Sequence, residues 1–172
     1  EPGHVERDLD ELWRNACDAI RRCIAEAGID PGQIAALGCA GHGNGLYLLD
    51  RDDKPLIGIQ SLDMRAASLA GELASEAAER LHAICLQQPW PSQTPVLLSW
   101  LRRYRPELLE RAGALLMCKD FVTFRLTGNK VSEISDMSGA GLLRMPECRY
   151  DKDLLALYGL EGLDYLLQPM ID

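Results

Sequence analysis

The feature that most constrains this chain is a glycine-rich pentapeptide, Gly41-His42-Gly43-Asn44-Gly45, which lies one residue after the short apolar run Ile34–Cys39. A continuous apolar run of this length indicates a strand that is buried on both faces of a sheet. Closely spaced glycines let a backbone approach a bound molecule and let its amides point outward. Because open α/β sheets bind ligands at the carboxyl ends of their strands, the pentapeptide is either a ligand-binding floor or a plain connection between strands.

Helices and strands alternate along the chain. The apolar residues of 9–27 fall on one helical face, with Asp8 suited to the N-cap and Gly28 to the left-handed residue after the helix. Residues 46–57 predict a hairpin with a charged turn. The other predicted elements are helices that begin at Asp63, Thr94, Pro106, Asp120, Asp151 and Gly162, strands at 115–117 and Val131, and a loop over Ser135–Gly141. This alternation predicts one α/β domain with a mixed sheet.

Composition excludes several classes of function. The chain has 172 residues, 47% of them apolar, and its net charge of -8 argues against nucleic acid as a partner. No apolar run is long enough to span a membrane. The six cysteines form no Cys-x-x-Cys pair and are accompanied by three histidines, so we expect no metal site in this chain. Most of these cysteines have apolar neighbours, which predicts buried, reduced thiols and a cytoplasmic protein.

Four residues are candidates for ligand contacts, and each has a structural alternative, which is a hydrogen-bonded structural histidine for His42 and a place in a plain connection between strands for Asn44. His42 can donate and accept a hydrogen bond, and the Asn44 carboxamide offers two donors and an acceptor. Asp63 lies where a strand ends and a helix begins, so it either binds a ligand or caps that helix. Trp90 lies between two prolines, where it either stacks on a ligand or seals a loop. The chain has no phosphate-binding G-x-x-x-x-G-K-S/T, and no G-x-S-x-G supports a hydrolase that uses His42.

Four segments together resemble the FGGY carbohydrate kinases in their order and spacing. They are GCAGHGNGLYLLDRDDKPL, IQSLDMRA, TPVLLSWLRRYRPELL and LLMCKDFVTFRLTGNKVSEISDMSG, and the opening EPGHVERDLDELW resembles the segment before that family's first long helix. The resemblance covers essentially the whole chain. It implies an α/β, ribonuclease H-like (actin-like ATPase) domain with a mixed sheet, of which residues 1–172 are an incomplete part, the sugar-binding interior of the N-terminal domain.

Members of this family use MgATP to phosphorylate a hydroxyl of a polyol or ketose. The resemblance therefore implies ATP and Mg as cofactors of the full-length enzyme, and a small sugar or polyol as its substrate. It places no catalytic residue in this chain, because the family's catalytic Asp belongs to a motif beyond Asp172, and the nucleotide-holding C-terminal domain is absent as well. We expect the isolated chain to be inactive. We also expect an unpaired sheet edge beside Ile34–Cys39 or the hairpin to favour association, for example as a homodimer.

Residue chemistry and the resemblance together predict substrate contacts from His42, Gly43, Asn44, Asp63 and Trp90. Gly43 and Asn44 stand where glycerol kinases have Arg and Glu and where xylulokinases have Met and His. The small-residue form GHGNGL is most similar to the L-xylulokinase and erythritol-kinase branch, which predicts a small ketose or sugar alcohol as substrate. The alternative function is a non-catalytic actin-like or sugar-binding interaction module.

Overall fold

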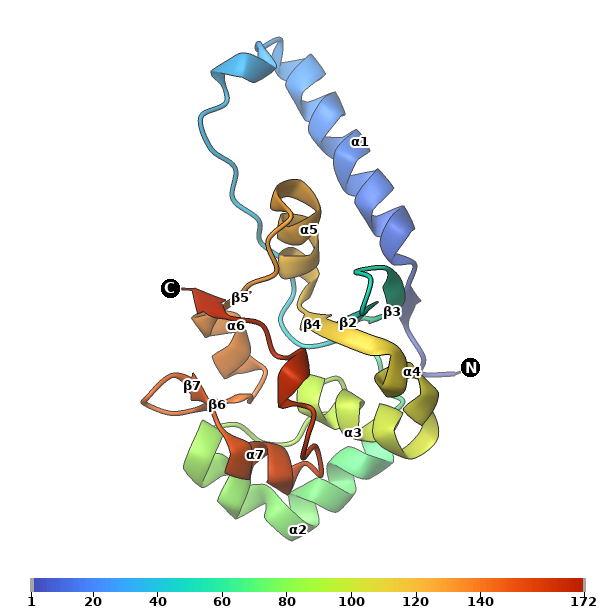
Figure 1. Ribbon diagram of the computed structural model, residues 1–172, viewed down its shortest axis with the longest axis vertical. Helices are drawn as coiled ribbons and strands as arrows, with labels where there is room; N and C mark the ends of the chain where they lie inside the picture. Colours follow the sequence, from blue (N-terminus) through green and yellow to red (C-terminus); the bar gives the residue numbers. More distant parts are fainter. Residues whose placement is uncertain (1, 172) are drawn as a thin grey trace.

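The first long helix, α1 (Leu9–Ala27), begins and ends where the sequence predicts. The Asp8 carboxylate accepts a hydrogen bond from the Glu11 amide at 2.8 Å, and Gly28 closes the helix with a φ of 64°. The computed structural model describes residues 2–171, and in it the C-terminal half of α1 projects away from the rest of the molecule (Figure 1). Of the residues in this helix, Leu9 alone is fully buried.

A four-stranded antiparallel sheet lies at the centre, in the order β1-β3-β2-β4. The predicted hairpin is confirmed and forms its middle strands. The prediction of a mixed sheet is wrong for this sheet, and the parallel pair found within residues 2–171 lies in a separate ladder between β5 and β8. The strands are β1 (Glu6–Arg7), β2 (Leu46–Asp50), β3 (Pro55–Ile59), β4 (Ala112–Leu116), β5 (Ser132–Glu133), β6 (Leu143–Arg144), β7 (Arg149–Tyr150) and β8 (Met170–Ile171).

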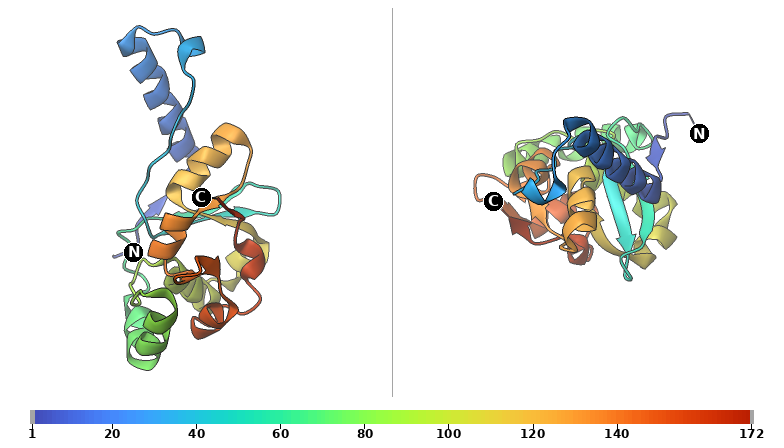
Figure 2. Two further views of the ribbon diagram at one scale, coloured as in Figure 1. Left: turned by 90° about the vertical axis from the view of Figure 1, so that its left-hand side faces the viewer. Right: turned by 90° about the horizontal axis from the view of Figure 1, so that it is seen from above.

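Both faces of β2 are buried, and helices cover each of them. Leu46 and Leu48 point into the larger core, which α2, α3, α4, α6 and α7 complete, whereas Tyr47 and Leu49 pack against α1 and α5 (Figures 1 and 2). Alternate residues of a strand face opposite sides of a sheet, so this all-apolar strand is what a doubly covered sheet requires. The remaining helices are α2 (Ala67–Cys85), α3 (Thr94–Tyr104), α4 (Pro106–Arg111), α5 (Cys118–Thr127), α6 (Ile134–Gly139) and α7 (Lys152–Leu157), with 3-10 turns η1 (Pro31–Gln33) and η2 (Asp164–Leu166).

The predicted strand Ile34–Cys39 is wrong. After η1 the chain runs extended toward β2 as a long arm beside α1, and no strand within residues 2–171 pairs with it (Figure 2). Ile34 and Leu37 are 41% and 54% exposed, so the run is not buried on both faces. Extended backbone becomes a strand only when a neighbour takes up its hydrogen bonds, and the apolar pattern alone does not supply that neighbour.

Several element boundaries differ from the predictions for local reasons. α2 begins at Ala67 rather than Asp63, whereas α3 begins at Thr94 as predicted, with Gln93 as its N-cap residue. The predicted loop Ser135–Gly141 is largely helix α6, because the Glu133 carboxylate accepts hydrogen bonds from two amides of the first turn. The strand predicted at Val131 begins one residue later, at β5, and the helix predicted from Gly162 is the 3-10 turn η2. The helices predicted from Pro106 and Asp151 form, with Asp151 as an N-cap.

The cysteines are less buried than predicted. All six are free thiols, but only Cys85 is buried, Cys23 is exposed, and the others are half-buried. Their apolar neighbours in sequence lie on helix faces and on the extended arm, which the described fold covers only in part. None of the helices between residues 2 and 171 has the length and apolar character needed to cross a membrane.

Candidate functional site

The residues Gly41–Gly45, here called the glycine bend, connect the extended arm to β2. Gly45 has a φ of +76°, and its amide donates to the Ser92 carbonyl at 2.7 Å. The Thr94 hydroxyl donates to the Gly45 carbonyl, also at 2.7 Å. These two hydrogen bonds join the glycine bend to the loop before α3 and to the first residue of α3, so the structure brings together two segments that are about fifty residues apart in the sequence.

His42 is half-buried and points back toward β2. Its Nε2 lies 2.9 Å from the Tyr47 hydroxyl, and its Nδ1 lies 3.4 Å from the Gly43 carbonyl. The pKa of His42 is raised, chiefly by a hydrogen bond with the Cys118 thiol and despite an opposing effect of burial. The imidazole is therefore held in place by Tyr47 of β2 and by the backbone of the bend itself.

Asn44 carries the clearest unmet polar group of the bend. The residue has a φ of 62°, a left-handed conformation that Asn tolerates better than most residues. Its side-chain oxygen is buried and has no hydrogen-bond partner among the described residues. Because an unpaired buried oxygen costs free energy, this atom calls for a donor that the described residues do not supply.

Two residues of other elements complete the surroundings of the bend. A Cβ placed on Gly43 would lie 3.7 Å from Asp136 Oδ1. The other oxygen of Asp136 forms an ion pair with Lys119 Nζ at 2.8 Å. Lys119 also pairs with the buried Asp120 at 2.6 Å. Burial alone would lower the pKa of Lys119, but the two carboxylates outweigh it and the pKa is raised.

Sequence reasoning did not assign roles to these neighbours. Lys119 and Asp136 lie within the segment LLMCKDFVTFRLTGNKVSEISDMSG, whose pattern predicts the family resemblance, yet only the fold brings them beside Gly43. Cys118 and Tyr47, which contact His42, read in sequence as members of apolar runs. The available signals in the sequence were Asp136 among small residues and the pair Lys119-Asp120. Neither signal indicates that these residues lie near the glycine bend, which is more than seventy positions earlier.

Trp90 lies beside the bend and is accessible. Its indole N–H donates to the Ser92 hydroxyl at 2.9 Å, and Ser92 is the residue whose carbonyl receives the Gly45 amide. The residue is 55% exposed, which contradicts the interpretation that Trp90 packs to seal the loop. An exposed indole that is anchored at its polar edge offers an aromatic face to a ligand.

Asp63 is in a different position from the other predicted contacts. It is fully buried, and its oxygens accept hydrogen bonds from the Val5 amide at 2.6 Å and from the backbone and guanidinium of Arg65 at 2.9 Å. The Arg65 side chain is itself 1% exposed and also pairs with Glu6. With each oxygen already accepting two hydrogen bonds, Asp63 does not reach a ligand surface and it does not cap α2, so neither alternative drawn from its sequence position describes it.

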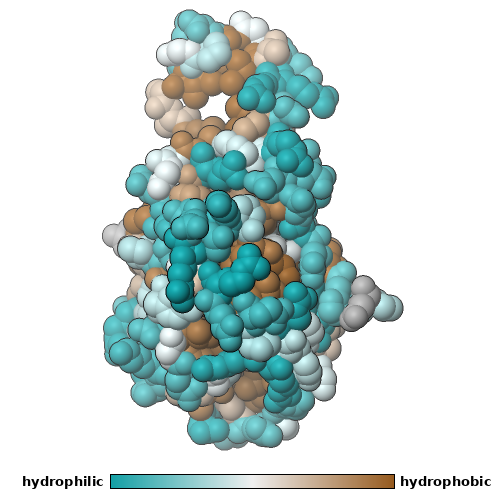
Figure 3. Space-filling view, turned by 45° about the vertical axis from the view of Figure 1, so that its right-hand side comes forward, coloured by the Kyte–Doolittle hydropathy of each residue, from teal (hydrophilic) through white to brown (hydrophobic). Residues whose placement is uncertain are grey.

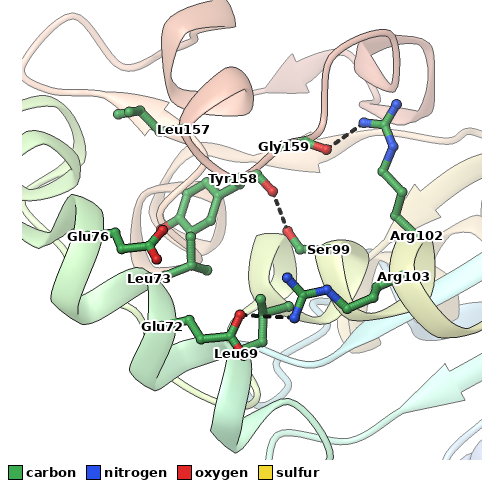
Figure 4. Close-up of a pocket in the computed structure, with 10 residues that line it drawn as sticks. All are labelled: Leu69, Glu72, Leu73, Glu76, Ser99, Arg102, Arg103, Leu157, Tyr158 and Gly159. Carbon is green, nitrogen blue, oxygen red and sulfur yellow. Dashed lines mark hydrogen bonds and ion pairs between the residues drawn. The ribbon is translucent and has the colours of Figure 1, made fainter.

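A separate hollow of about 340 Å³ lies between α2, α3 and α7, on another part of the molecule (Figure 4). Several of its polar groups already have partners. Arg103 pairs with Glu72 at 2.9 Å, Arg102 donates to the Gly159 carbonyl at 2.5 Å, and the Ser99 hydroxyl donates to the Tyr158 carbonyl at 2.7 Å. Because these groups satisfy one another, the hollow makes a weaker ligand site than the glycine bend, where an acceptor is unpaired.

The arrangement of the described residues is that of sugar kinases of known structure. A structure described as a "xyloylose kinase from Brucella ovis" superimposes with a TM-score of 0.89 at 28% identity, covering 100% of this chain and 36% of that one. A gluconate kinase from Lactobacillus acidophilus, at 24% identity, shares the fold with a TM-score of 0.86. The α/β fold of this class, expected from the sequence, is thus confirmed.

The chain belongs to the FGGY family of carbohydrate kinases, whose N-terminal domain model matches residues 1–171. Among curated proteins it is 35% identical to a probable L-xylulose kinase of Pasteurella multocida, over 99% of this chain and 36% of the relative. It is 33% identical to the L-xylulose/3-keto-L-gulonate kinase of Escherichia coli, with 99% and 35% coverage. The chain therefore spans about a third of the length of these relatives. These similarities leave the hydrolase hypothesis without support.

Proposed function

We propose that the whole protein transfers a phosphoryl group from ATP to a hydroxyl of a small ketose or sugar alcohol. In this proposal residues 1–172 belong to the N-terminal, sugar-binding domain and supply part of the wall that binds the acceptor. The proposal is supported by relatives named as L-xylulose kinases, to which the chain is similar over nearly its whole length. Family membership supports ATP as the phosphoryl donor.

The observation that carries the sugar-binding role is the unpaired side-chain oxygen of Asn44. A sugar hydroxyl is a donor of the size and strength that this buried oxygen lacks. Gly43 has no side chain between the bend and Asp136, which leaves room for a hydroxyl-bearing carbon to approach. The exposed face of Trp90 then covers the apolar C–H surface that a sugar presents beside its hydroxyls.

His42 and Asp63 serve this wall in different ways. The imidazole of His42 is anchored to Tyr47 and Gly43, so it fixes the course of the bend while its ring edge borders the acceptor. Asp63 is proposed to act indirectly, because its ion pair with Arg65 and its bond to Val5 hold the segment that follows β3. That segment lies against the bend, since the Gly45 backbone packs on Ile59 and Ser61.

The described residues contribute to the acceptor side of the reaction. Residues 2–171 contain no group of three or more His, Cys, Asp or Glu side chains that could hold a metal ion. ATP, when bound, supplies the phosphoryl group, and the described side chains bind and orient the hydroxyl compound. On this account the 172-residue chain alone does not turn over substrate.

A coupled ADP-release assay tests the proposal. The complete product of the encoding gene is incubated with MgATP and with L-xylulose, D-xylulose, erythritol or glycerol. We expect acceptor-dependent ADP release with a pentulose or tetritol, weaker release with glycerol, and no release from the 172-residue chain. A folded complete product that releases no ADP with any small polyol or ketose would contradict the kinase assignment and favour the non-catalytic interaction module.

The cellular location and the self-association of the protein belong to the same proposal. The six unpaired thiols support a reducing, cytoplasmic location. The exposed apolar residues around the arm, which Figure 3 shows as brown surface at the projecting end of the molecule, support association, for example as a homodimer. Dilution-dependent elution in size-exclusion chromatography would agree with association, and a monomer at every concentration would contradict it.

A further inference from the structure

Asp136 lies where the first turn of α6 approaches the glycine bend. A Cβ on Gly43 would be 3.7 Å from Asp136 Oδ1, and a Cβ on Gly41 would be 3.1 Å from the amide nitrogen of Lys119 in α5. Gly41 therefore lets α5 come close to the bend, and the space beside Gly43 is bordered by the Asp136 carboxylate. Because Gly43 and Asn44 are consecutive, this carboxylate borders the same short stretch of backbone that carries the Asn44 carboxamide.

The Asp136 carboxylate is engaged at one oxygen and open at the other. Its Oδ2 pairs with Lys119 Nζ at 2.8 Å, and the side chain is 13% exposed. Lys119 is held in turn by Asp120 at 2.6 Å, and the Glu133 carboxylate accepts a hydrogen bond from the Asp136 amide at 3.2 Å. No hydrogen bond to Oδ1 is present among residues 2–171. The lysine therefore orients a carboxylate whose second oxygen remains an acceptor without a donor.

One ammonium group serves two carboxylates in this cluster. Burial would lower the pKa of Lys119, but Asp120 and Asp136 raise it, so the ammonium stays protonated. Because Asp120 shares this cation, the negative charge of Asp136 is compensated only in part. A second negative charge about 4 Å away would be repelled by an amount that lowers affinity roughly fivefold in water-like surroundings, and by more where water is excluded.

Two oxygen acceptors without donors thus border the glycine bend, Asn44 Oδ1 and Asp136 Oδ1. A polyol or ketose carries hydroxyl donors on several carbons, so one molecule can serve both acceptors. A sugar acid has a carboxylate in place of one of these hydroxyl-bearing carbons, and that group has no donor and the same sign of charge as Asp136. A site that hydrogen-bonds a hydroxyl rejects an analogue without it, because the polar group of the site is left unpaired.

We propose that Asp136 is a specificity-determining residue, whose Oδ1 accepts a hydrogen bond from a second hydroxyl of the acceptor and whose charge disfavours compounds with a carboxylate at that position. The inference rests on the proposed function, because it concerns which compound the same sugar-binding wall takes. It names the class as neutral polyols and ketoses, in preference to sugar acids of the same carbon skeleton.

The substitution Asp136→Asn should reverse this preference, because Lys119 donates toward this position. The amide oxygen that the substitution introduces turns toward Lys119, so the amide NH₂ takes the place of Oδ1. An acceptor beside Gly43 then becomes a donor, which suits a carboxylate. Asp136→Ala removes both groups and leaves Lys119 paired with Asp120.

The test is calorimetric titration of the complete gene product, without ATP, with two matched pairs of compounds. The pairs are erythritol with erythronate and xylitol with xylonate, and each acid differs from its polyol at one terminal carbon. The wild type should bind the polyol at least about fivefold more tightly than the acid, and Asp136→Asn should lower this ratio at least about fivefold. Asp136→Ala should weaken polyol binding roughly tenfold. Asp52→Asn, at an exposed aspartate of the hairpin turn, is the matched control and should change neither affinity.

The outcomes separate this inference from the kinase proposal. Equal binding of polyol and acid by the wild type, no binding of either polyol, or an unchanged ratio in folded Asp136→Asn would each overturn the role of Asp136. If Asp136→Asn does not fold by circular dichroism, Asp136→Ala and the wild-type ratio decide. ADP release that persists beside an unchanged ratio removes this inference and leaves the kinase proposal. A ratio that shifts as expected, without ADP release from any acceptor, does the reverse.

Discussion

Substituting Gly45→Ala should destabilise the fold more than any other glycine change in the bend. The left-handed φ of +76° costs an alanine about 1 kcal/mol, after the lower entropy of the unfolded alanine chain is allowed for. A Cβ would also lie 3.2 Å from Gln60 C and Ser61 N, and nearer still to the Ile59 carbonyl oxygen, all of them backbone atoms. Because backbone cannot move aside as a side chain can, overpacking adds about 1 to 3 kcal/mol. The sum is about 2 to 4 kcal/mol.

Gly28→Ala is the matched control for this prediction. Gly28 has nearly the same conformation, with a φ of +64°, but a Cβ there would meet nothing within 4 Å. Its cost should be the conformational part alone, about 1 kcal/mol. Urea denaturation of both variants, followed by circular dichroism, gives the two free energies of unfolding. If Gly45→Ala is no more destabilising than Gly28→Ala, the close packing of the bend on Ile59 and Ser61 is refuted.

Three other predictions rest on neighbouring contacts. Arg65→Met leaves the buried Asp63 carboxylate unpaired and should cost about 3 to 5 kcal/mol of unfolding free energy in urea, whereas a loss below 1 kcal/mol would contradict the buried pair. Burial raises the pKa of Asp63, but its hydrogen bonds outweigh that effect and lower the pKa, so the stabilising contribution of Asp63 is present above its unfolded pKa, near 3.9, and is lost as the pH falls through the folded value. Urea midpoints that stay constant from pH 5 into the acid range would contradict this prediction. An Asp63→Asn variant that still loses stability in acid would contradict it as well. Gly43→Ala should fold normally, since its Cβ would be in ordinary contact at 3.7 Å from Asp136, yet weaken sugar binding in calorimetry by occupying the acceptor's space; unchanged affinity would place the acceptor elsewhere.

Elements with local signals could be predicted from the sequence. The ends of α1 were predictable because Asp8 and Gly28 satisfy the helix termini through contacts within a few residues. The hairpin was predictable because its turn and its apolar strands are contiguous. The strand predicted at Ile34–Cys39 failed for the opposite reason. Its apolar character is present, but strand pairing depends on a partner elsewhere, and within residues 2–171 there is none.

The candidate site divides in the same way. Asn44 and Gly43 could be identified because unusual residue types are concentrated in one short segment. The proximity of Asp136 and Cys118 to the bend could not, since it arises only when α5 and α6 pack beside it. For Asp63 the sequence suggested a ligand contact, because its carboxylate follows the end of a strand. In the structure the partner of this carboxylate is Arg65, which is two residues away and whose side chain is equally buried.

The central claim is that the glycine bend binds a sugar hydroxyl through Asn44, and calorimetric titration of the complete gene product with its best acceptor tests it most directly. The variant is Asn44→Gly, which removes the carboxamide and keeps the positive φ without strain, and Asn129→Gly at an exposed asparagine is the control. Loss of one hydrogen bond worth about 0.5 to 1.5 kcal/mol should weaken binding roughly twofold to tenfold in Asn44→Gly and leave the control unchanged. Equal affinity in wild type and Asn44→Gly would contradict the account.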